Sequence, residues 1–223
     1  DEVSFTIEEG ETLSLVGETG CGKTTTGRLA LRLIEPTSGK IFFDGNDILT
    51  LTKKEMRVLR RNMQIVFQDP FASLNPRKSV RDMLSMPSKV QDISDEADVR
   101  IGRIREMLEL VGLTPTSEFI DRFPHELSGG QRQRICIARA LILGPKFIVA
   151  DEPVSSLDAS VRSQVINLML DLQENLKLTY LLITHDLSVV KCMTARIAVM
   201  YVGEIVELAN QEAFFDSPQH PYS

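Results

Sequence analysis

Four short apolar runs interrupt the polar stretches of the chain, at residues 12–16, 63–67, 146–150 and 180–184. Each is about five residues long and rich in branched side chains, a pattern typical of strands buried on both faces. Between the third and fourth runs, apolar residues recur at helical spacing across 160–172. Strands that alternate with helices predict an α/β fold whose mainly parallel sheet is covered on both sides.

The segment 70–144 has a different pattern. Prolines punctuate short helical stretches, and one apolar stripe recurs every three or four residues over 101–111 and ends at Gly112. We therefore expect a helical subdomain at 70–144, inserted into a core made of residues 1–69 and 145–223.

Two further regions predict antiparallel strands. Residues 3–7 and 40–43 alternate or run apolar between glycines, which favours strands that flank the main sheet. Nearer the end of the chain, 197–201 and 204–208 are apolar-rich runs about Gly203, a pattern typical of a hairpin. A small antiparallel β subdomain is therefore expected beside the parallel sheet.

The composition limits the class of protein. Its 25 basic and 31 acidic residues give a net charge of −6, which argues against a nucleic-acid partner. Cys21, Cys136 and Cys192 show neither metal-ligand spacing nor a disulfide framework, which favours a reducing compartment. No apolar run approaches the roughly 18–20 residues that span a bilayer, so we expect any membrane role to come through another subunit.

A glycine-rich loop follows the first apolar run and matches the phosphate-binding pattern G-x-x-x-x-G-K-[ST] in full. Its glycines let the backbone aim N–H groups at phosphate oxygens, and the helix that follows adds its positive N-terminal end. Lys23 is expected to bridge the phosphates of ATP, and the Thr24 hydroxyl to bind Mg²⁺. The predicted nucleotide-binding residues of this P-loop are Gly17, Glu18, Thr19, Gly20, Cys21, Gly22, Lys23, Thr24 and Thr25.

Polar side chains follow the other three runs: Gln68, the pair Asp151 and Glu152, and His185. Because ligands bind beyond the carboxyl ends of parallel strands, we expect these groups at one sheet edge with the P-loop. Asp151 would hold Mg²⁺, and Glu152 would act as the general base that activates water. Two solvated acids would be the simpler interpretation in isolation, but the neighbouring P-loop favours the catalytic one.

Residues 127–131, with the letters LSGGQ, point to a second site. Ser128 and Gln131 form an S-x-x-Q capping box, which predicts the start of a helix. A cap alone does not account for Gly129 and Gly130, whose bare N–H groups at a helix start favour a second anion site. One chain needs only one γ-phosphate site, so a second indicates that this chain completes a partner's active site.

In this order and spacing, the P-loop, Gln68, LSGGQ, the Asp151-Glu152 pair and His185 resemble the ATP-binding subunits of ABC (ATP-binding cassette) transporters over essentially the whole chain. The resemblance implies a P-loop NTPase core, with ATP and Mg²⁺ bound. It also implies that Gln68 senses Mg²⁺ and the attacking water and couples the site to the membrane subunit. By the same resemblance His185 contacts the γ-phosphate, and 155–158 forms the D-loop at a dimer seam.

The resemblance also implies a set of partners. Two ATP-binding subunits, identical or paralogous, would form a head-to-tail dimer in which each ATP lies between one P-loop and the other LSGGQ segment. Transmembrane permease subunits and, indirectly, a solute-binding protein would complete the transporter, with no nucleic acid. The subunit would lie at the cytoplasmic face of the inner membrane.

Four segments narrow the resemblance further: 66–77, 123–126, 152–158 and 220–223 are similar to oligopeptide and dipeptide importers. Nickel and glutathione importers share this subfamily, so these cargoes stay open. The family's adenine-stacking aromatic residue precedes the first strand, and a tail usually follows the His-Pro-Tyr motif. We therefore expect this chain to be trimmed at both ends.

Three other classes share parts of this pattern. Chromosome-maintenance and DNA-repair ATPases insert a long coiled coil between P-loop and signature, whereas only 102 residues separate Thr24 from Leu127 here, without sustained heptads. Soluble translation-factor-like relatives carry two cassettes in one chain, but this sequence has a single P-loop. A non-catalytic subunit is disfavoured because Glu152 and His185 are both present.

Overall fold

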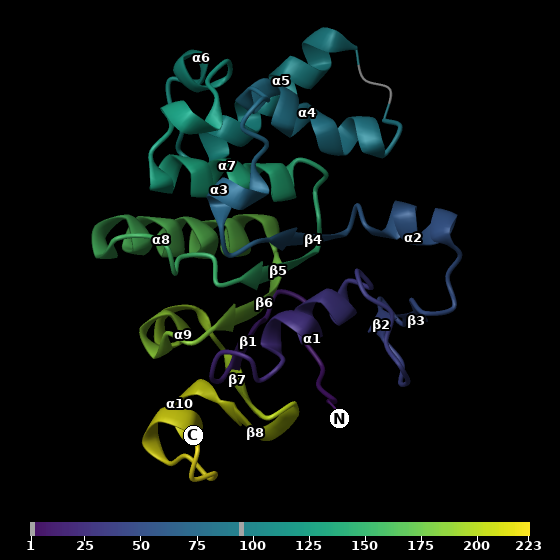
Figure 1. Cartoon of the computed structure of the whole chain (residues 1–223), viewed down its shortest axis with the longest axis vertical. Helices are drawn as coiled ribbons and strands as arrows, with labels where there is room; N and C mark the ends of the chain where they lie inside the picture. Colours follow the sequence, from purple (N-terminus) through teal and green to yellow (C-terminus); the bar gives the residue numbers. More distant parts are fainter. Residues whose placement is uncertain (1–2, 94–95) are drawn as a thin grey trace.

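The computed structural model describes residues 3–93 and 96–223, which form a six-stranded sheet, a two-stranded sheet and helices around them (Figure 1). The apolar runs become strands because they are buried on both faces, as every residue of Thr12–Val16, Phe147–Asp151 and Thr179–Thr184 is. The strands are β1 (Thr12–Val16), β2 (Phe42–Phe43), β3 (Asn46–Asp47), β4 (Met63–Val66), β5 (Phe147–Asp151), β6 (Thr179–Thr184), β7 (Arg196–Tyr201) and β8 (Glu204–Asn210). The helices are α1 (Lys23–Ala30), α2 (Lys53–Leu59), α3 (Pro70–Ser73), α4 (Val80–Val90), α5 (Ala97–Leu110), α6 (Thr116–Phe119), the 3₁₀-helix η1 (Pro124–Glu126), α7 (Gly129–Leu141), α8 (Ala159–Leu176), α9 (Leu187–Met193) and α10 (Gln211–Asp216).

The large sheet has the strand order β4-β5-β6-β1-β7-β8. All neighbouring strands from β4 to β7 are parallel, and β8 pairs antiparallel with β7. The four strands predicted from the apolar runs are therefore confirmed. Because they are parallel, their carboxyl ends lie at one edge of the sheet, where the P-loop, Gln68, the Asp151-Glu152 pair and His185 follow.

Successive side chains on the central strands enter two different hydrophobic clusters, one on each face of the sheet. Ile148 on β5 and Leu182 on β6 belong to one cluster. Their neighbours Val149 and Ile183 belong to the other cluster. The cluster around Ile148 continues into α7 and α8, whereas the cluster around Val149 includes Leu31 at the end of α1. Helices α7 and α8 thus cover one face, and α1 covers the other (Figure 1).

Between β4 and β5, the described residues form helices and loops, gathered at one end of the molecule in Figure 1. Helix α7 also packs on β4 and α8, and its buried Ile135 and Ile137 belong to the same cluster as the sheet. Separate subdomain boundaries at 70 and 144 therefore stay a prediction, since one apolar cluster joins these helices to the core. None of the described helices is both long and apolar enough to span a bilayer.

The strand predicted at residues 3–7 is wrong. Alternate side chains there are half-buried against the cluster around Val149, but the segment is not part of a strand. Its alternation follows from burial on one side, whereas a strand also needs a neighbouring backbone that accepts its hydrogen bonds. The Thr6 carbonyl oxygen instead accepts from the Arg196 side chain at 3.2 Å.

Two antiparallel strand pairs lie within residues 3–93 and 96–223. The strand predicted at 40–43 is shorter than expected, because only β2 pairs, with β3. The predicted hairpin is confirmed as β7–β8. Its loop residues Val202 and Gly203 have φ values of 46° and 86°, which the two-residue turns of twisted hairpins require. The predicted fold class, a mainly parallel sheet with an added antiparallel one, is therefore confirmed.

Candidate active site

The P-loop leaves the end of β1 and curls into α1 through three glycines with positive φ, at 151° for Gly17, 90° for Gly20 and 112° for Gly22. A Cβ at Gly17 would lie 2.1 Å from the Met200 carbonyl oxygen, so a larger residue would displace β7. Gly22 is the N-cap of α1 and has no side chain to cap the first N–H groups of the helix. The loop therefore has the backbone geometry of an anion site.

Lys23 holds its ammonium within the curve of this loop. The residue is 6% exposed, and its Nζ donates to the carbonyl oxygens of Gly17 and Glu18, both at 2.7 Å. The two backbone carbonyl oxygens thus hold the positive charge of Lys23 beside the N–H groups of the loop. A positive charge next to N–H donors favours binding of a phosphate chain. The other predicted contacts lie along the loop and the first turn of α1; they are Thr19, Gly20, Cys21, Thr24 and Thr25.

The fold brings Thr24 and Asp151 together from 127 positions apart. The Thr24 hydroxyl donates to Asp151 Oδ1 at 3.0 Å, and Asp151 is 5% exposed at the end of β5. Burial raises the pKa of the Asp151 carboxyl, and the hydrogen bond from Thr24 opposes that rise. A buried carboxylate with a single hydroxyl partner is a favourable position for a cation.

This donor set fits Mg²⁺. Within residues 3–93 and 96–223, no group of three His, Cys, Asp or Glu side chains converges as a metal site held by protein alone would need. Mg²⁺ prefers hard oxygen ligands and usually combines one or two carboxylates with water and substrate phosphates. Thr24 and Asp151 therefore suit a magnesium ion that is bound together with a nucleotide.

Glu152 is held from two sides. Gln68 Nε2 donates to its Oε2 at 2.7 Å, and His185 Nδ1 lies 2.8 Å from its Oε1. Its backbone has a φ of 45°, a left-handed conformation that costs a non-glycine residue on the order of 1–3 kcal/mol. Its N–H donates to the Ile183 carbonyl oxygen at 2.8 Å, which keeps the residue beside the end of β6. The Gln68 amide and the His185 ring, predicted from two other strand ends, thus meet at the Glu152 carboxylate.

Ser128 begins α7 with the predicted capping box. Its Oγ accepts from the Gln131 N–H at 3.3 Å, and Gln131 Oε1 accepts from the Ser128 N–H at 2.9 Å. Gly129 and Gly130 form the first turn, and a Cβ at Gly130 would lie 2.4 Å from Cγ1 of Val161. Helix α7 packs on the sheet face opposite α1, so the fold separates this segment from the helix of its own P-loop.

Comparison with known proteins decides the family. A family model described as ABC transporter matches residues 1–155. The chain belongs to the ABC transporter family. Its whole length is 55% identical to a Brucella ovis relative named for peptide import and ATP binding, of which it covers 69%. It is 52% identical to the oligopeptide transport ATP-binding protein AppF of Bacillus subtilis and to the glutathione import ATP-binding protein GsiA of Escherichia coli, covering 67% and 35% of them.

Solved ABC structures share this fold. The cbiO1 protein of Clostridium perfringens, part of the transporter complex cbiONQ, has a TM-score of 0.84 at 30% identity, over 96% of this chain and 83% of that one. A dimeric cassette in a post-hydrolysis state, bound to ADP and Pi, has a TM-score of 0.83 at 30% identity, over 93% and 88% of the two chains. The chain is therefore an ABC ATPase that binds nucleotide.

The ABC ATPase fold also positions an arginine that the sequence patterns did not predict. Arg162 on α8 donates from Nη1 to Asp186 Oδ2 at 2.8 Å and from Nη2 to the Leu157 carbonyl oxygen at 3.3 Å. It thereby links the segment 155–158 to the N-cap of α9, which directly follows His185. No local motif marks Arg162, because a single arginine on a helix is usually a solvated side chain.

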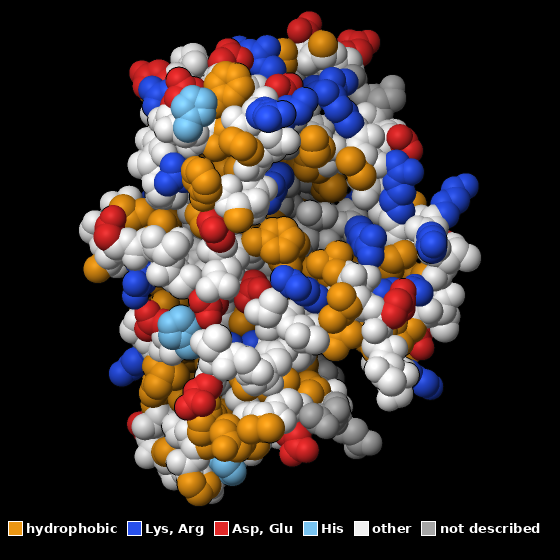
Figure 2. Space-filling view, in the orientation of Figure 1, with side chains coloured by type: hydrophobic (Ala, Val, Ile, Leu, Met, Phe, Trp, Pro, Cys, Tyr) orange, Lys and Arg blue, Asp and Glu red, His pale blue; other side chains and the backbone are white. Residues whose placement is uncertain are grey.

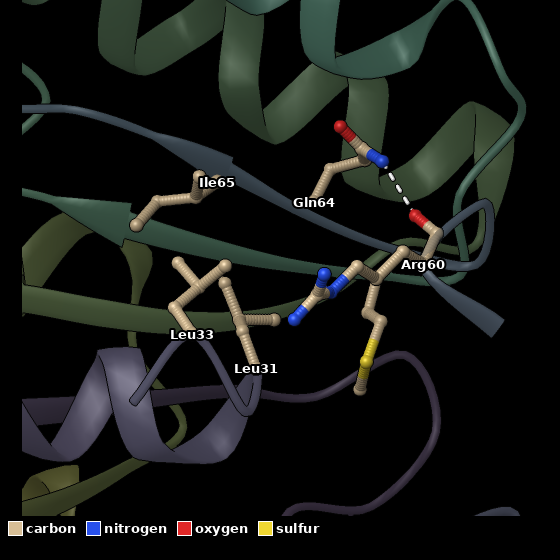
Figure 3. A pocket seen from close by; sticks show the side chains of 6 residues that line it. Leu31, Leu33, Arg60, Gln64 and Ile65 are labelled. Atoms are coloured by element: carbon tan, nitrogen blue, oxygen red, sulfur yellow. Dashed lines mark hydrogen bonds between the residues drawn. The ribbon is translucent and has the colours of Figure 1, made fainter. Parts of the chain in front are cut away.

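A separate small pocket of about 120 Å³ lies beside β4. Figure 3 shows Leu31, Leu33 and Ile65 close to one another, with Gln64 Nε2 donating to the Arg60 carbonyl oxygen at 2.5 Å. No residue of the P-loop, the signature or the polar strand ends lines this pocket. It is therefore distinct from the active site of the ABC ATPase.

Because Val161 lies so close to Gly130, a pair of variants can test whether the start of α7 needs a glycine. Gly130→Ala would place a methyl group 2.4 Å from the Val161 side chain, so we expect the start of α7 to move and the ATPase rate to fall about tenfold. Adding Val161→Ala removes the clashing atom and should restore most of the rate. Steady-state phosphate release from both single variants and the double variant measures this. A double variant as slow as Gly130→Ala would contradict the steric explanation.

Proposed function

We propose that this ABC ATPase hydrolyses ATP as one subunit of a membrane importer of oligopeptides or dipeptides. The observation that carries the proposal is the convergence at the Glu152 carboxylate, which Gln68 and His185 hold at 2.7 and 2.8 Å. The P-loop with Lys23 lies at the same edge of the sheet. A phosphate cradle and a positioned carboxylate are the two parts that hydrolysis of a phosphoanhydride requires.

ATP binding is assigned to the P-loop. N–H groups of the loop and of the first turn of α1 would donate to phosphate oxygens, and Lys23 would add a positive charge at the β- and γ-phosphates. Thr24, Asp151 and the amide oxygen of Gln68 hold Mg²⁺, which supplies further positive charge for the phosphate oxygens when bound.

Hydrolysis is assigned to Glu152 as general base. Its carboxylate accepts a proton from water, the water oxygen bonds to the γ-phosphorus, and the bond to the ADP oxygen breaks. Gln68 and His185 fix the orientation of the carboxylate. The His185 side chain is 57% exposed, which leaves its ring accessible to the γ-phosphate. The products are ADP and inorganic phosphate.

The LSGGQ segment serves a second ATP-binding subunit, identical or paralogous. Because α7 and α1 cover opposite faces of the sheet, residues 128–131 are available to close the P-loop of a partner in a head-to-tail dimer. The first turn of α7 would then bring its N–H groups to the partner's γ-phosphate. The D-loop at 155–158 would lie along the seam between the subunits.

The contact with transmembrane permease subunits is assigned to a hollow beside α3. Figure 2 shows hydrophobic side chains in this hollow, with Lys and Arg side chains around it. Phe71 is 60% exposed on α3, three positions after Gln68, and Val58, Met86 and Val90 are also exposed. A permease segment bound there would act on Gln68 through the short loop between β4 and α3.

The cargo assignment rests on the relatives named for peptide import and on the segments 66–77 and 220–223. Glutathione remains the second candidate cargo, because GsiA is as similar as AppF, and nickel is the third. In each case the solute-binding protein and the permease would select the solute. The ATPase would work at the cytoplasmic face of the inner membrane.

Reconstitution of the complete transporter tests the proposal. We expect Mg²⁺-dependent ATP hydrolysis, pairing of the ATPase subunits in ATP, and uptake of labelled di- to pentapeptides into vesicles in the presence of the solute-binding protein. Uptake of glutathione or Ni²⁺ with no peptide uptake would reject the peptide assignment alone. Absence of both ATP hydrolysis and ATP-dependent pairing would reject the proposal as a whole.

A further inference from the structure

The segment His220-Pro221-Tyr222-Ser223 lies against the P-loop, although the two are about 200 positions apart. The Tyr222 hydroxyl oxygen accepts from the backbone N–H of Glu18 at 2.8 Å. Glu18 is the first residue after Gly17, at the point where the chain leaves β1 and begins to curl. A side chain from the far end of the sequence therefore contacts the phosphate-binding loop itself.

Hydrogen bonds within the segment and a contact with Tyr201 hold the Tyr222 side chain in this position. The Ser223 N–H donates to the His220 carbonyl oxygen at 2.9 Å, which closes a turn with Pro221 at its second position, where a fixed φ is favourable. The Tyr222 N–H donates to His220 Nδ1 at 3.2 Å inside the same turn. The Tyr222 ring packs on Tyr201, with 4.6 Å between ring centroids.

The turn is fastened to β8 by one carboxylate. Glu207 accepts from the Gln219 N–H at 3.0 Å and from the His220 N–H at 2.9 Å, one on each oxygen. Glu207 is 9% exposed, so these hydrogen bonds form at the protected base of the turn. Backbone donors to a carboxylate are stronger than neutral hydrogen bonds.

The backbone of Glu18 is thus held through both its N–H and its carbonyl oxygen. Its N–H donates to Tyr222, and its carbonyl oxygen accepts from Lys23 Nζ at 2.7 Å and from the Cys21 N–H at 3.3 Å. The Cys21 carbonyl oxygen in turn accepts from Gly203 in the β7–β8 loop at 3.0 Å. One of the two backbone oxygens that hold the Lys23 ammonium therefore belongs to a residue whose N–H donates to the tyrosine hydroxyl.

We propose that Tyr222 is a positioning residue for ATP binding, which sets the first turn of the P-loop and, through the backbone of Glu18, the place of the Lys23 ammonium. This inference rests on the proposed ATPase function. It gives the His-Pro-Tyr motif a role in the nucleotide site in addition to its place in the fold. Tyr222 itself is not assigned a contact with ATP.

Tyr222→Phe tests the proposal, because it removes the hydroxyl and keeps the ring on Tyr201. Loss of one hydrogen bond should raise the KM for ATP about threefold to tenfold, with kcat within about twofold of the unmodified protein. The matched control is Tyr201→Phe, whose hydroxyl has no hydrogen bond to any described residue; its KM should stay unchanged. Amide hydrogen exchange should show faster exchange at Glu18 in Tyr222→Phe only, with the protection of the β1 amides kept.

A double-mutant cycle tests whether Glu207 affects ATP binding through Tyr222. Glu207→Ala removes the acceptor that fastens the turn, so it should raise the KM for ATP, and the double variant with Tyr222→Phe should be no worse than the more affected single variant. A KM and a Glu18 exchange rate in Tyr222→Phe equal to those of the unmodified protein would overturn the inference. An unmodified protein that does not hydrolyse ATP would instead reject the proposed function, which separates the two failures.

Discussion

Replacing Glu152 with glutamine is expected to lower the rate of ATP hydrolysis by a factor of about 10² to 10⁴, the range that a general base contributes. The amide has nearly the shape of the carboxylate and keeps an oxygen that accepts from Gln68, so the strained turn after β5 should persist. What it loses is the capacity to accept a proton from water. ATP binding should therefore be unchanged, and the ATP-bound dimer should accumulate.

Two measurements check this expectation: single-turnover hydrolysis, and the dimer fraction in ATP from sedimentation or light scattering. Glu174→Gln on the exposed side of α8 is the matched control, because it makes the same chemical change near the C-terminal end of that helix, before the start of β6. Robust turnover in Glu152→Gln would refute the assignment of the base. Loss of ATP binding would show that the carboxylate has a structural role in the loop.

Replacing Lys23 with alanine is expected to abolish ATP binding at micromolar nucleotide. Hydrogen bonds to charged groups contribute about 1.5–3 kcal/mol each, so the loss of an ammonium that contacts two phosphates should weaken binding by at least about 10²-fold. The ammonium is also bonded to the carbonyl oxygens of Gly17 and Glu18. The same variant should therefore loosen the loop that presents the N–H groups.

Equilibrium binding of a fluorescent ATP analogue, with and without Mg²⁺, measures this effect. Cys21→Ala is the matched control from the same loop, because it keeps the backbone and removes only a thiol, which lies 3.8 Å from Lys23 Nζ and is not assigned a phosphate contact. We expect that control to bind ATP within a fewfold of the unmodified protein. Nucleotide affinity in Lys23→Ala equal to that of Cys21→Ala would contradict the phosphate role of the lysine.

Much of this site was predictable because each part lies at the end of a strand with a clear signature. Five-residue apolar runs identified β1, β4, β5 and β6, and parallel pairing then places the following residues at one edge. The prediction was wrong at residues 3–7. There the alternation of apolar and polar residues reflects burial of one side of the segment, and no neighbouring strand in the described part of the chain pairs with it. Hydrophobic pattern reports which side chains are buried, and it does not report which backbone groups pair.

By itself, the sequence determined the features that depend on near neighbours: the left-handed glycines of the P-loop and the Ser128–Gln131 cap of α7. Only the tertiary structure decided that Glu152 bonds to His185, 33 positions away, and Glu18 to Tyr222, 204 positions away. Local features require a favourable conformation of a few consecutive residues. Distant contacts depend on the order of strands in the sheet and on side-chain packing between elements, which emerge only when the whole chain is folded.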